Sequence, residues 1–329
     1  MDMTTLREHG GPDHAGAACH DFSTNANACG PCPQALAAVQ SADATRYPDP
    51  ASTQLRALLA DFHAVDAERI VIAASASEFI FRITGWAARE GVRDVALPRH
   101  AYGDYAHAAR AWGLERAGSA QRAGLAWACE PSSPLGQQEE DWAQRLAGGA
   151  VVVLDRAYEP LRLAGACSLA PAQLGRVWQL WSPNKALGLT GVRAAYAIAP
   201  AGGESAARAL DALAPSWPLG AHGEALLRAW TEPAAQQWLA GSRATLRDWK
   251  SLQEQVCLGL GWQLRPGCAN FFVARAPGLA SALPALRARG IRLRDCASFG
   301  LPGEVRLAVQ APAAQDALRE AWCELEAHR

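Results

Sequence analysis

The chain has 329 residues, of which 50% are hydrophobic and 19% are charged, and its formal net charge is -1. This composition is typical of a folded protein with one large and one smaller domain, and the neutral balance offers no basic surface for nucleic acid or an anionic membrane. No apolar run approaches the roughly 20 residues of a membrane-spanning helix, and the N-terminus lacks the apolar core of a signal peptide. We therefore expect a cytoplasmic protein, with no nucleic-acid or membrane partner, that acts on small molecules.

The first 32 residues are polar and irregular, and residues 52–63 are the first segment with the spacing of a helix, with Ser52 as the expected N-cap. From there short apolar runs alternate with helical patterns such as 77–90 and 102–113. The expected buried strands are 70–75, 94–98, 125–131, 151–155, 177–182 and 193–199. This alternation predicts an α/β fold in which helices cover both faces of a mostly parallel sheet.

After Pro218 the pattern changes, and residues 220–260 are strongly helical. They are followed by expected strands at 271–276, 291–294 and 304–309 and by expected helices at 279–289 and 312–328. This order predicts a smaller α+β domain. We divide the chain into an N-terminal segment (1–45) associated with the small domain and the active site, a large domain (46–215) and a small C-terminal domain (216–329).

The nine cysteines have no regular spacing, which suits a reducing compartment. Cys29-Gly30-Pro31-Cys32 has the spacing of a redox dithiol, but the residues before it favour a turn and not the strand that such a motif needs. We therefore expect a turn that opens a helix. The histidines at 100, 107 and 222 have neither the spacing nor the carboxylate neighbours of a metal site, and no metal is expected.

Polar residues follow two of the expected strands, where an open α/β sheet binds its ligands. Asp155 ends one strand, Ser182-Pro183-Asn184-Lys185 follows the next, and Arg193 comes eight residues after the lysine. Pyridoxal 5′-phosphate (PLP) requires an amine for its aldehyde, a carboxylate for its pyridine nitrogen, and cations or amides for its phosphate. We expect Lys185 to hold PLP as a Schiff base and Asp155 to pair with the pyridine nitrogen.

The phosphate of the cofactor would lie near the start of a helix, where backbone amides are free to bind anions. The expected helix start is Ser75-Ala76-Ser77-Glu78, directly after the strand at 70–75, so Ala76 and Ser77 are candidate phosphate ligands. Ser182 and Arg193 are the other candidates. The large domain is therefore the part of the chain expected to bind PLP.

The spacing of D-x-x-Y, S-x-x-K and the arginine eight residues later resembles fold-type I PLP enzymes of the class I/II aminotransferase superfamily, and the motif order fits nearly the whole chain. The resemblance implies that Asp155 and Lys185 act on PLP as described and that Tyr158 contacts its 3′-oxygen. It also implies that Tyr102, in the stretch HAYGDY, stacks on the cofactor ring.

Two further roles follow from the same resemblance. Tyr47, in Arg46-Tyr47-Pro48-Asp49-Pro50, would reach the phosphate of the neighbouring subunit's cofactor, which implies a homodimer with shared active sites. Arg306, in the stretch EVRLAV, would clamp the α-carboxylate of the substrate, a task suited to a planar guanidinium.

The RYPDP and DFSTNAN stretches resemble the branch that holds the histidinol-phosphate aminotransferases and the threonine-phosphate decarboxylases. His9-Gly10-Gly11, Ser77-Glu78-Phe79-Ile80-Phe81 and the segment 291–296 resemble the decarboxylases. That likeness implies decarboxylation of L-threonine O-3-phosphate to (R)-1-amino-2-propanol O-2-phosphate and CO2, in cobalamin biosynthesis.

Two alternatives stay open. One is an aminotransferase acting on a phosphorylated amino compound such as histidinol phosphate, because the same residues serve both reactions. The other is a catalytically silent binding module, against which the intact Lys185, Asp155 and Arg193 argue.

Four further residues are candidates for the site. His9 is either a surface histidine or a contact to the substrate phosphate, Asn27 is a turn residue or a substrate contact, and Arg294 is a surface residue or a second cationic arm beside Arg306. Ser133 takes the position of the second asparagine in the N-P-x-N-P-x-G stretch that the family usually carries. A serine is shorter, so a water would be needed to bridge it to the cofactor.

Overall fold

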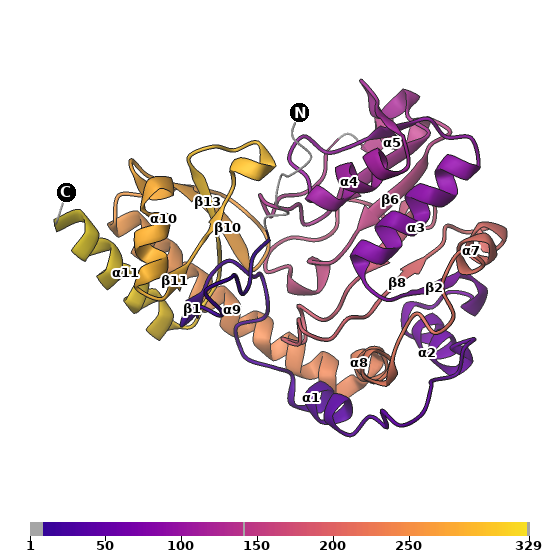
Figure 1. Ribbon diagram of the computed structural model, residues 1–329, viewed down its shortest axis with the longest axis horizontal. Coiled ribbons are helices and arrows are strands. Elements are labelled where there is room, and N and C mark those ends of the chain that lie inside the picture. Colours follow the sequence, from indigo (N-terminus) through magenta and orange to yellow (C-terminus); the bar gives the residue numbers. More distant parts are fainter. Residues whose placement is uncertain (1–8, 141, 328–329) are drawn as a thin grey trace.

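A mostly parallel sheet of seven strands forms the centre of the computed structural model, which describes residues 9–140 and 142–327 (Figure 1). The spatial order is β2 (Ile70–Ala73), β8 (Ala195–Ile198), β7 (Trp178–Trp181), β6 (Val151–Asp155), β5 (Leu125–Cys129), β3 (Asp94–Ala96) and β4 (Glu115–Arg116). Only β8 runs antiparallel to its neighbours. The predicted α/β fold is confirmed. Each expected strand of this sheet is present, with the predicted bounds at 151–155 and with shorter bounds elsewhere.

Alternate residues of the strands pack on opposite faces of this sheet, as a period of two requires. In β2, Val71 and Ala73 join the core under α3 (Ala76–Arg89), α4 (Gly103–Ala111) and α7 (Glu204–Asp211). Ile70 and Ile72 join the core under α1 (Pro33–Gln40), α2 (Thr53–His63) and α8 (Ala221–Thr231). The short helices α5 (Trp142–Ala147) and α6 (Pro171–Leu174) lie near the β5–β6 side of the sheet, where Trp142 joins a separate cluster. Helices therefore cover both faces.

The start of α2 differs from the prediction. Ser52 has a positive φ of 50° and its side chain caps nothing. The carboxylate of Asp49 accepts the Thr53 amide at 2.8 Å and the Ala51 amide at 3.0 Å, and these bonds lower the pKa of Asp49. Ser52 therefore occupies the predicted N-cap position, but the side chain that caps the helix is that of Asp49, which the Asp49-Pro50 turn brings to the helix end.

The small domain is built on a four-stranded antiparallel sheet within the described residues. Its order is β12 (Arg294–Asp295), β13 (Glu304–Ala308), β10 (Phe271–Arg275) and β9 (Gln263–Arg265), and α10 (Leu279–Ala288) and α11 (Pro312–Ala327) pack against it. Residue 328 of the expected last helix lies outside the described residues. None of the helices described in the structure could cross a membrane.

A single long helix, α9 (Pro233–Gly259), belongs to both cores. Its first half contributes Leu239 and Leu246 to the core beneath the large sheet, whereas Cys257 near its end packs in the small domain. Helix α8 also packs on α1 and α2. Helix α8 and the first half of α9 follow residue 216, yet they share the core of the large domain. The division of the chain at residue 216 therefore stays a prediction.

The N-terminal arm (residues 9–32) links the two domains (Figure 1). Its strand β1 (His20–Asp21) pairs in parallel with β11 (Ile291–Arg292) of the small domain. Further on, the amide of buried Cys32 donates to the Leu187 carbonyl at 2.8 Å, and α1 begins at the next residue. All nine cysteines are free. The Cys29–Cys32 stretch is thus a turn that opens a helix and packs on the loop that carries Lys185.

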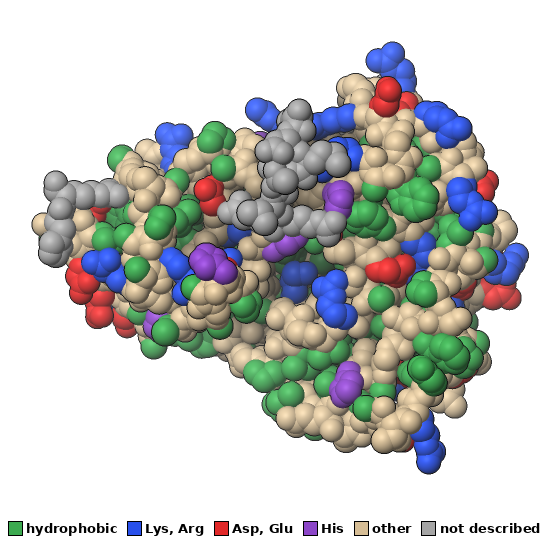
Figure 2. Space-filling model, in the orientation of Figure 1, with side chains coloured by type: hydrophobic (Ala, Val, Ile, Leu, Met, Phe, Trp, Pro, Cys, Tyr) green, Lys and Arg blue, Asp and Glu red, His purple; other side chains and the backbone are tan. Residues whose placement is uncertain are grey.

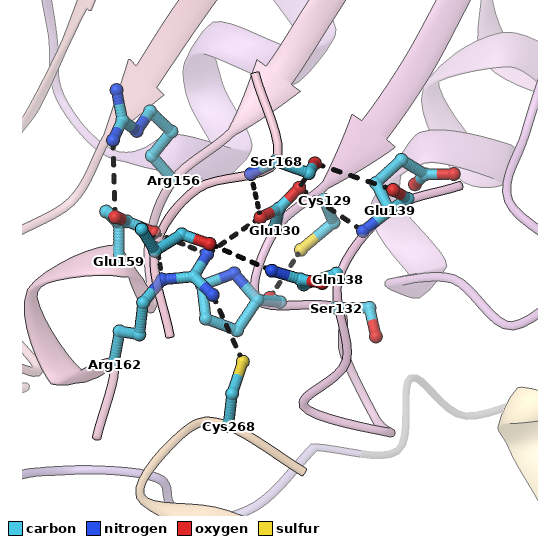
Figure 3. A network of polar contacts seen from close by, with 12 residues as sticks. Cys129, Glu130, Ser132, Gln138, Glu139, Arg156, Glu159, Arg162, Ser168 and Cys268 are labelled. Carbon is cyan, nitrogen blue, oxygen red and sulfur yellow. Dashed lines mark hydrogen bonds and ion pairs between the residues drawn. The ribbon is translucent and has the colours of Figure 1, made fainter. Parts of the chain in front are cut away.

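A buried ion-pair network fixes residues 130–137, which we call the Ser133 loop (Figure 3). Glu130 is fully buried, and its carboxylate accepts Arg162 Nη2 at 2.9 Å and the Ser168 amide at 2.8 Å. Arg162 also pairs with Glu159 and donates to the Cys268 sulfur at 3.2 Å. The network therefore ties the loop after β5 to the segment after β6 and to the small domain.

Replacing Arg162 with methionine should destabilise the protein by about 3–5 kcal/mol, because it leaves the Glu130 carboxylate buried without its cation. The exposed Arg208–Glu68 pair, with side chains 66% and 71% exposed, provides the control, and Arg208→Met should cost about 1 kcal/mol or less. Urea unfolding followed by tryptophan fluorescence measures both. Equal losses in the two variants would contradict the importance of the buried pair.

Candidate active site

Lys185 lies in the loop after β7, at the carboxyl end of the sheet, and is one of only two lysines in the chain. It is half-buried, and its Nζ lies 5.3 Å from the centre of the Tyr158 ring. The other lysine, Lys250 on α9, donates to the carbonyl oxygens of Gly267 and Ala269. Lys185 is therefore the one lysine at this edge of the sheet.

The turn that presents Lys185 is held by Asn184. Its Oδ1 accepts the Ser182 hydroxyl at 2.9 Å and the Lys185 amide at 3.0 Å. Ser182, a candidate phosphate ligand, thus donates its hydroxyl within the turn. A Cβ on Gly188, whose φ is +68°, would lie 2.6 Å from the Gly30 oxygen, so the N-terminal arm closes on the loop at a position that only glycine fits.

Asn27 of the arm hydrogen-bonds the backbone of this loop. Its backbone amide donates to the Lys185 carbonyl at 2.9 Å, and its side-chain Nδ2 donates to the Ala186 carbonyl at 3.0 Å. The neighbouring Asn25 was missed by sequence reasoning. It is 2% exposed, and neither its Nδ2 nor its Oδ1 has a partner among the described residues. Because buried amides are normally satisfied, Asn25 is the better candidate of the two for a ligand contact.

Asp155 ends β6 and is buried. Its Oδ1 accepts the Ala157 amide at 2.9 Å, and its Oδ2 accepts the Tyr105 hydroxyl at 2.6 Å. Burial raises the pKa of this carboxyl, and the two hydrogen bonds and the nearby Lys185 oppose that effect. Sequence reasoning missed Tyr105, although it lies three residues after Tyr102 and therefore on the same side of a helix.

The start of α3 lies beside Tyr102. Ser75 caps the helix by accepting the Glu78 amide at 3.1 Å, and Ala76 is the first helical residue. The Ser77 hydroxyl lies 3.2 Å from the Tyr102 hydroxyl. Burial, reinforced by Asp104, raises the pKa of Tyr102, which keeps its phenol neutral. The amides of the first helical turn have no carbonyl partners within the helix, so they can bind an anion.

Arg193 and Tyr47 are exposed, in contrast to the residues around Asp155. Arg193 makes no hydrogen bond or ion pair with any residue that the structure describes. Tyr47 is 78% exposed, yet its ring stacks on Trp217 with 4.5 Å between ring centres. Trp217 in turn donates its Nε1 to the Pro48 carbonyl at 3.1 Å. The exposed tyrosine is therefore held in a defined position.

Arg306 lies on β13 of the small domain and is buried. Its Nη1 donates to the Ser133 hydroxyl at 3.2 Å and its Nη2 to the Ser23 carbonyl at 2.9 Å, while its Nε has no partner among the described residues. Ser133 thus contacts the arginine. Burial lowers the pKa of Arg306, so the site disfavours this charge in the absence of an anion.

Arg294 lies directly opposite Arg306 across the β12–β13 ladder. It is also buried, and its two terminal nitrogens donate to the Asp295 carbonyl and the Ser298 hydroxyl, both at 2.8 Å. Arg294 is therefore not a surface residue. Two guanidinium groups on neighbouring strands give the small domain a strongly cationic face. Lys and Arg side chains are visible in the hollow between the two domains (Figure 2).

The start of the arm reaches the same region. The His9 ring lies 6.0 Å from the Tyr102 ring, and the Gly11 amide donates to the Ser23 hydroxyl at 2.8 Å. A Cβ on Gly10 would lie 2.1 Å from the Ser23 oxygen, so only glycine permits this approach. The His9-Gly10-Gly11 stretch therefore packs between Tyr102 and the segment that binds Arg306.

The residues at this edge complement PLP chemically. An amine at Lys185 suits an aldehyde, the buried carboxylate of Asp155 suits a pyridine nitrogen, and the free amides at the start of α3 together with unpaired Arg193 suit a phosphate. The donor set therefore fits the cofactor expected from the sequence. Within residues 9–140 and 142–327, no group of three metal-binding side chains comes together.

Known proteins with a similar sequence or fold include two named for phosphorylated substrates. The chain is 30% identical to histidinol-phosphate aminotransferase 1 from Thiobacillus denitrificans, over 88% of this chain and 80% of the relative. The solved histidinol-phosphate aminotransferase from Sinorhizobium meliloti, in complex with pyridoxal-5′-phosphate, superposes with a TM-score of 0.78 at 20% identity and covers 95% of this chain and 93% of its own. The solved L-threonine-O-3-phosphate decarboxylase from Porphyromonas gingivalis has a TM-score of 0.76 at 21% identity, and the match covers 94% of this chain and 99% of the decarboxylase.

The family description "Aminotransferase class I and II" matches residues 116–324, which is more than half of the chain. This segment includes Ser133, Asp155, Tyr158, Lys185, Arg193, Arg294 and Arg306. The chain belongs to the class I and II aminotransferase family, whose members depend on PLP.

Proposed function

We propose that this protein is a PLP-dependent aminotransferase whose amino substrate carries a phosphate, as histidinol phosphate does. The main supporting observation is that the Arg306 guanidinium is buried without a carboxylate partner among the described residues. Buried charges are ordinarily paired, and a substrate phosphate or carboxylate would supply the missing anion. The curated relatives of similar length are named histidinol-phosphate aminotransferases, which favours this choice over decarboxylation.

Four residues would hold the reactive part of the cofactor. Bound PLP supplies an electron sink for the bonds at the substrate Cα. Lys185 would bind its aldehyde through Nζ, and the Asp155 carboxylate would bind its pyridine nitrogen. The Tyr102 ring would lie against the cofactor ring, and the Tyr158 hydroxyl would contact its 3′-oxygen.

The cofactor phosphate would bind at the start of α3. The amides of Ala76 and Ser77, the Ser77 and Ser182 hydroxyls and the Arg193 guanidinium are its proposed ligands. Arg193 is exposed and unpaired with any described residue, so this cation needs no rearrangement to bind an anion. Ser182 would have to turn its hydroxyl away from Asn184.

The remaining residues would position the substrate and move its proton. Arg306, with Arg294 as a second cation, would bind the anionic group and fix the orientation of the Cα bonds. The amine of Lys185, once free of the cofactor, would take the proton from Cα. Asn27 would hold the Lys185 loop, and the arm around His9 would exclude water from this side of the site.

A second candidate is decarboxylation of L-threonine O-3-phosphate, in the cobalamin pathway. The position of His9 favours it: its ring lies 6.0 Å from that of Tyr102, so an imidazole could reach a substrate phosphate. The likeness to the Porphyromonas gingivalis decarboxylase is consistent with the same reaction. In that reaction Arg306 would bind the α-carboxylate that leaves as CO2.

We further propose that the active unit is a homodimer in which Tyr47 reaches the cofactor phosphate of the other subunit. The Tyr47 ring is 78% exposed, yet stacking on Trp217 holds it in place. An exposed aromatic ring in a fixed position is typical of a side chain that contacts a partner protein. The exposed Arg193 would be covered at the same interface.

The proposed activity is tested with histidinol phosphate plus 2-oxoglutarate, and with threonine phosphate alone, by measuring glutamate and CO2 separately. We expect glutamate from the first mixture and little CO2 from the second. Borohydride reduction followed by peptide mass spectrometry should place the cofactor on Lys185, with Lys250 as the internal control. CO2 release without a keto acid would establish the decarboxylase instead, and a cofactor label on neither lysine would refute both activities.

Replacing Tyr47 with phenylalanine should weaken PLP binding by roughly tenfold, since it removes one hydrogen bond to a charged phosphate. Trp112→Phe, at another exposed aromatic, is the control and should leave PLP binding unchanged. Sedimentation equilibrium should show a dimer for both variants. A fully active monomer would contradict the shared site.

A further inference from the structure

Tyr105 is the one side chain that hydrogen-bonds the Asp155 carboxylate in the structure as described. Its hydroxyl lies 2.6 Å from Asp155 Oδ2, and the ring is fully buried on α4. The second carboxylate oxygen accepts a backbone amide, that of Ala157. Both oxygens of Asp155 are therefore already bonded, and only one of those bonds comes from a side chain that mutation can change.

The Tyr105 ring is fixed by its surroundings. It stacks on the fully buried Trp127 of β5, with 4.5 Å between ring centres and 10° between ring planes. The Tyr102 ring meets it edge-on at 5.8 Å. Burial raises the pKa of Tyr105 well above its usual range, and the Asp155 charge reinforces this. The phenol thus keeps its proton and can act only as a donor toward the carboxylate.

We propose that Tyr105 is a positioning residue that keeps Asp155 ionised, so that the proton shared with the bound cofactor resides on the pyridine nitrogen. The inference rests on the proposed function, in which Asp155 binds that nitrogen. A donor to the carboxylate stabilises its charged form and disfavours its protonated form. Without the donor, a carboxyl buried this deeply would compete for the proton, and the cofactor would be a weaker electron sink.

The other groups around Asp155 do not replace Tyr105. Lys185 is the cation that acts on the carboxylate, but in the proposed function its amine is committed to the cofactor. Cys129, at the end of β5, is buried, and burial raises the pKa of its thiol, so it stays neutral. The Cys129 sulfur donates to the Pro131 carbonyl at 3.4 Å. Tyr105 therefore remains the principal donor when PLP is bound.

The test measures where the proton lies, by nitrogen NMR of the holoenzyme reconstituted with PLP labelled with 15N in its ring. The wild-type signal should lie between those of protonated and neutral pyridine and nearer the protonated one, so that it can move either way. Tyr105→Phe should move it toward the neutral form and lower kcat by roughly tenfold. Site-specific 3-fluorotyrosine at position 105 is a stronger donor and should move the signal the opposite way. This second variant keeps the test valid should Tyr105→Phe fail to fold.

Tyr196→Phe is the matched control. Tyr196 is also fully buried, and its hydroxyl is also bonded, to Trp230 Nε1 at 3.0 Å and to His63 Nε2 at 2.7 Å, but it packs in the core on the other face of the sheet. It should lose stability without any change in the nitrogen signal. An unchanged signal in both position-105 variants would overturn the inference, whereas failure of the wild type to bind PLP would overturn the proposed function itself.

Discussion

The site depends on keeping a carboxylate ionised where water cannot reach it. Asp155 is held at the end of the central strand β6 with both oxygens hydrogen-bonded, and burial alone would favour its neutral form. The surrounding elements supply the hydrogen bonds that water would otherwise provide. The turn after β6 gives the Ala157 amide, and α4 gives the Tyr105 hydroxyl. The position of α4 against β5, set by the stacking of Tyr105 on Trp127, is therefore part of the chemistry of the site.

The same problem recurs at two further buried charges, Glu130 and Arg306, and it is solved differently at each. Glu130 is paired internally with Arg162, so its charge serves the scaffold and fixes the Ser133 loop. Arg306 has only a hydroxyl and a carbonyl as hydrogen-bond partners among the described residues. Removing the partner of a paired buried charge destabilises a fold, whereas a buried charge that is incompletely paired is a candidate to bind a ligand. By this criterion Glu130 belongs to the scaffold, and Arg306 belongs to the proposed binding surface.

The large sheet could be predicted because its strands leave local signals in the sequence, and the same signals led to the candidate cofactor residues. Apolar runs of four to seven residues mark buried strands, and Asp155 and Lys185 follow such runs directly. Tyr105 was missed because its importance depends on Asp155, which lies far along the chain. Asn25 was missed because its importance depends on the lack of a partner. Ser52 was predicted to cap α2 because serine is a typical capping residue. The sequence does not show the left-handed backbone conformation of Ser52, which turns its side chain away from the helix end. Arg294 could not be placed for a similar reason, since two-residue strands leave no periodic pattern.

The arrangement also shows why the choice between breaking Cα–H and Cα–CO2 is difficult to derive from motifs. Bound PLP would supply the same electron sink to either reaction, so the outcome would depend on how the substrate's Cα bonds are oriented. In the proposed function Arg306 would hold the substrate's anionic group, and Asp155 with Lys185 would hold the cofactor. Arg306 donates to the Ser133 hydroxyl, which links its side chain to the loop after β5. The Glu130–Arg162 pair fixes that loop against the small domain. Under this proposal the choice of bond depends on where the small domain holds Arg306 relative to Asp155 and Lys185 of the large sheet, and no single residue type reveals it.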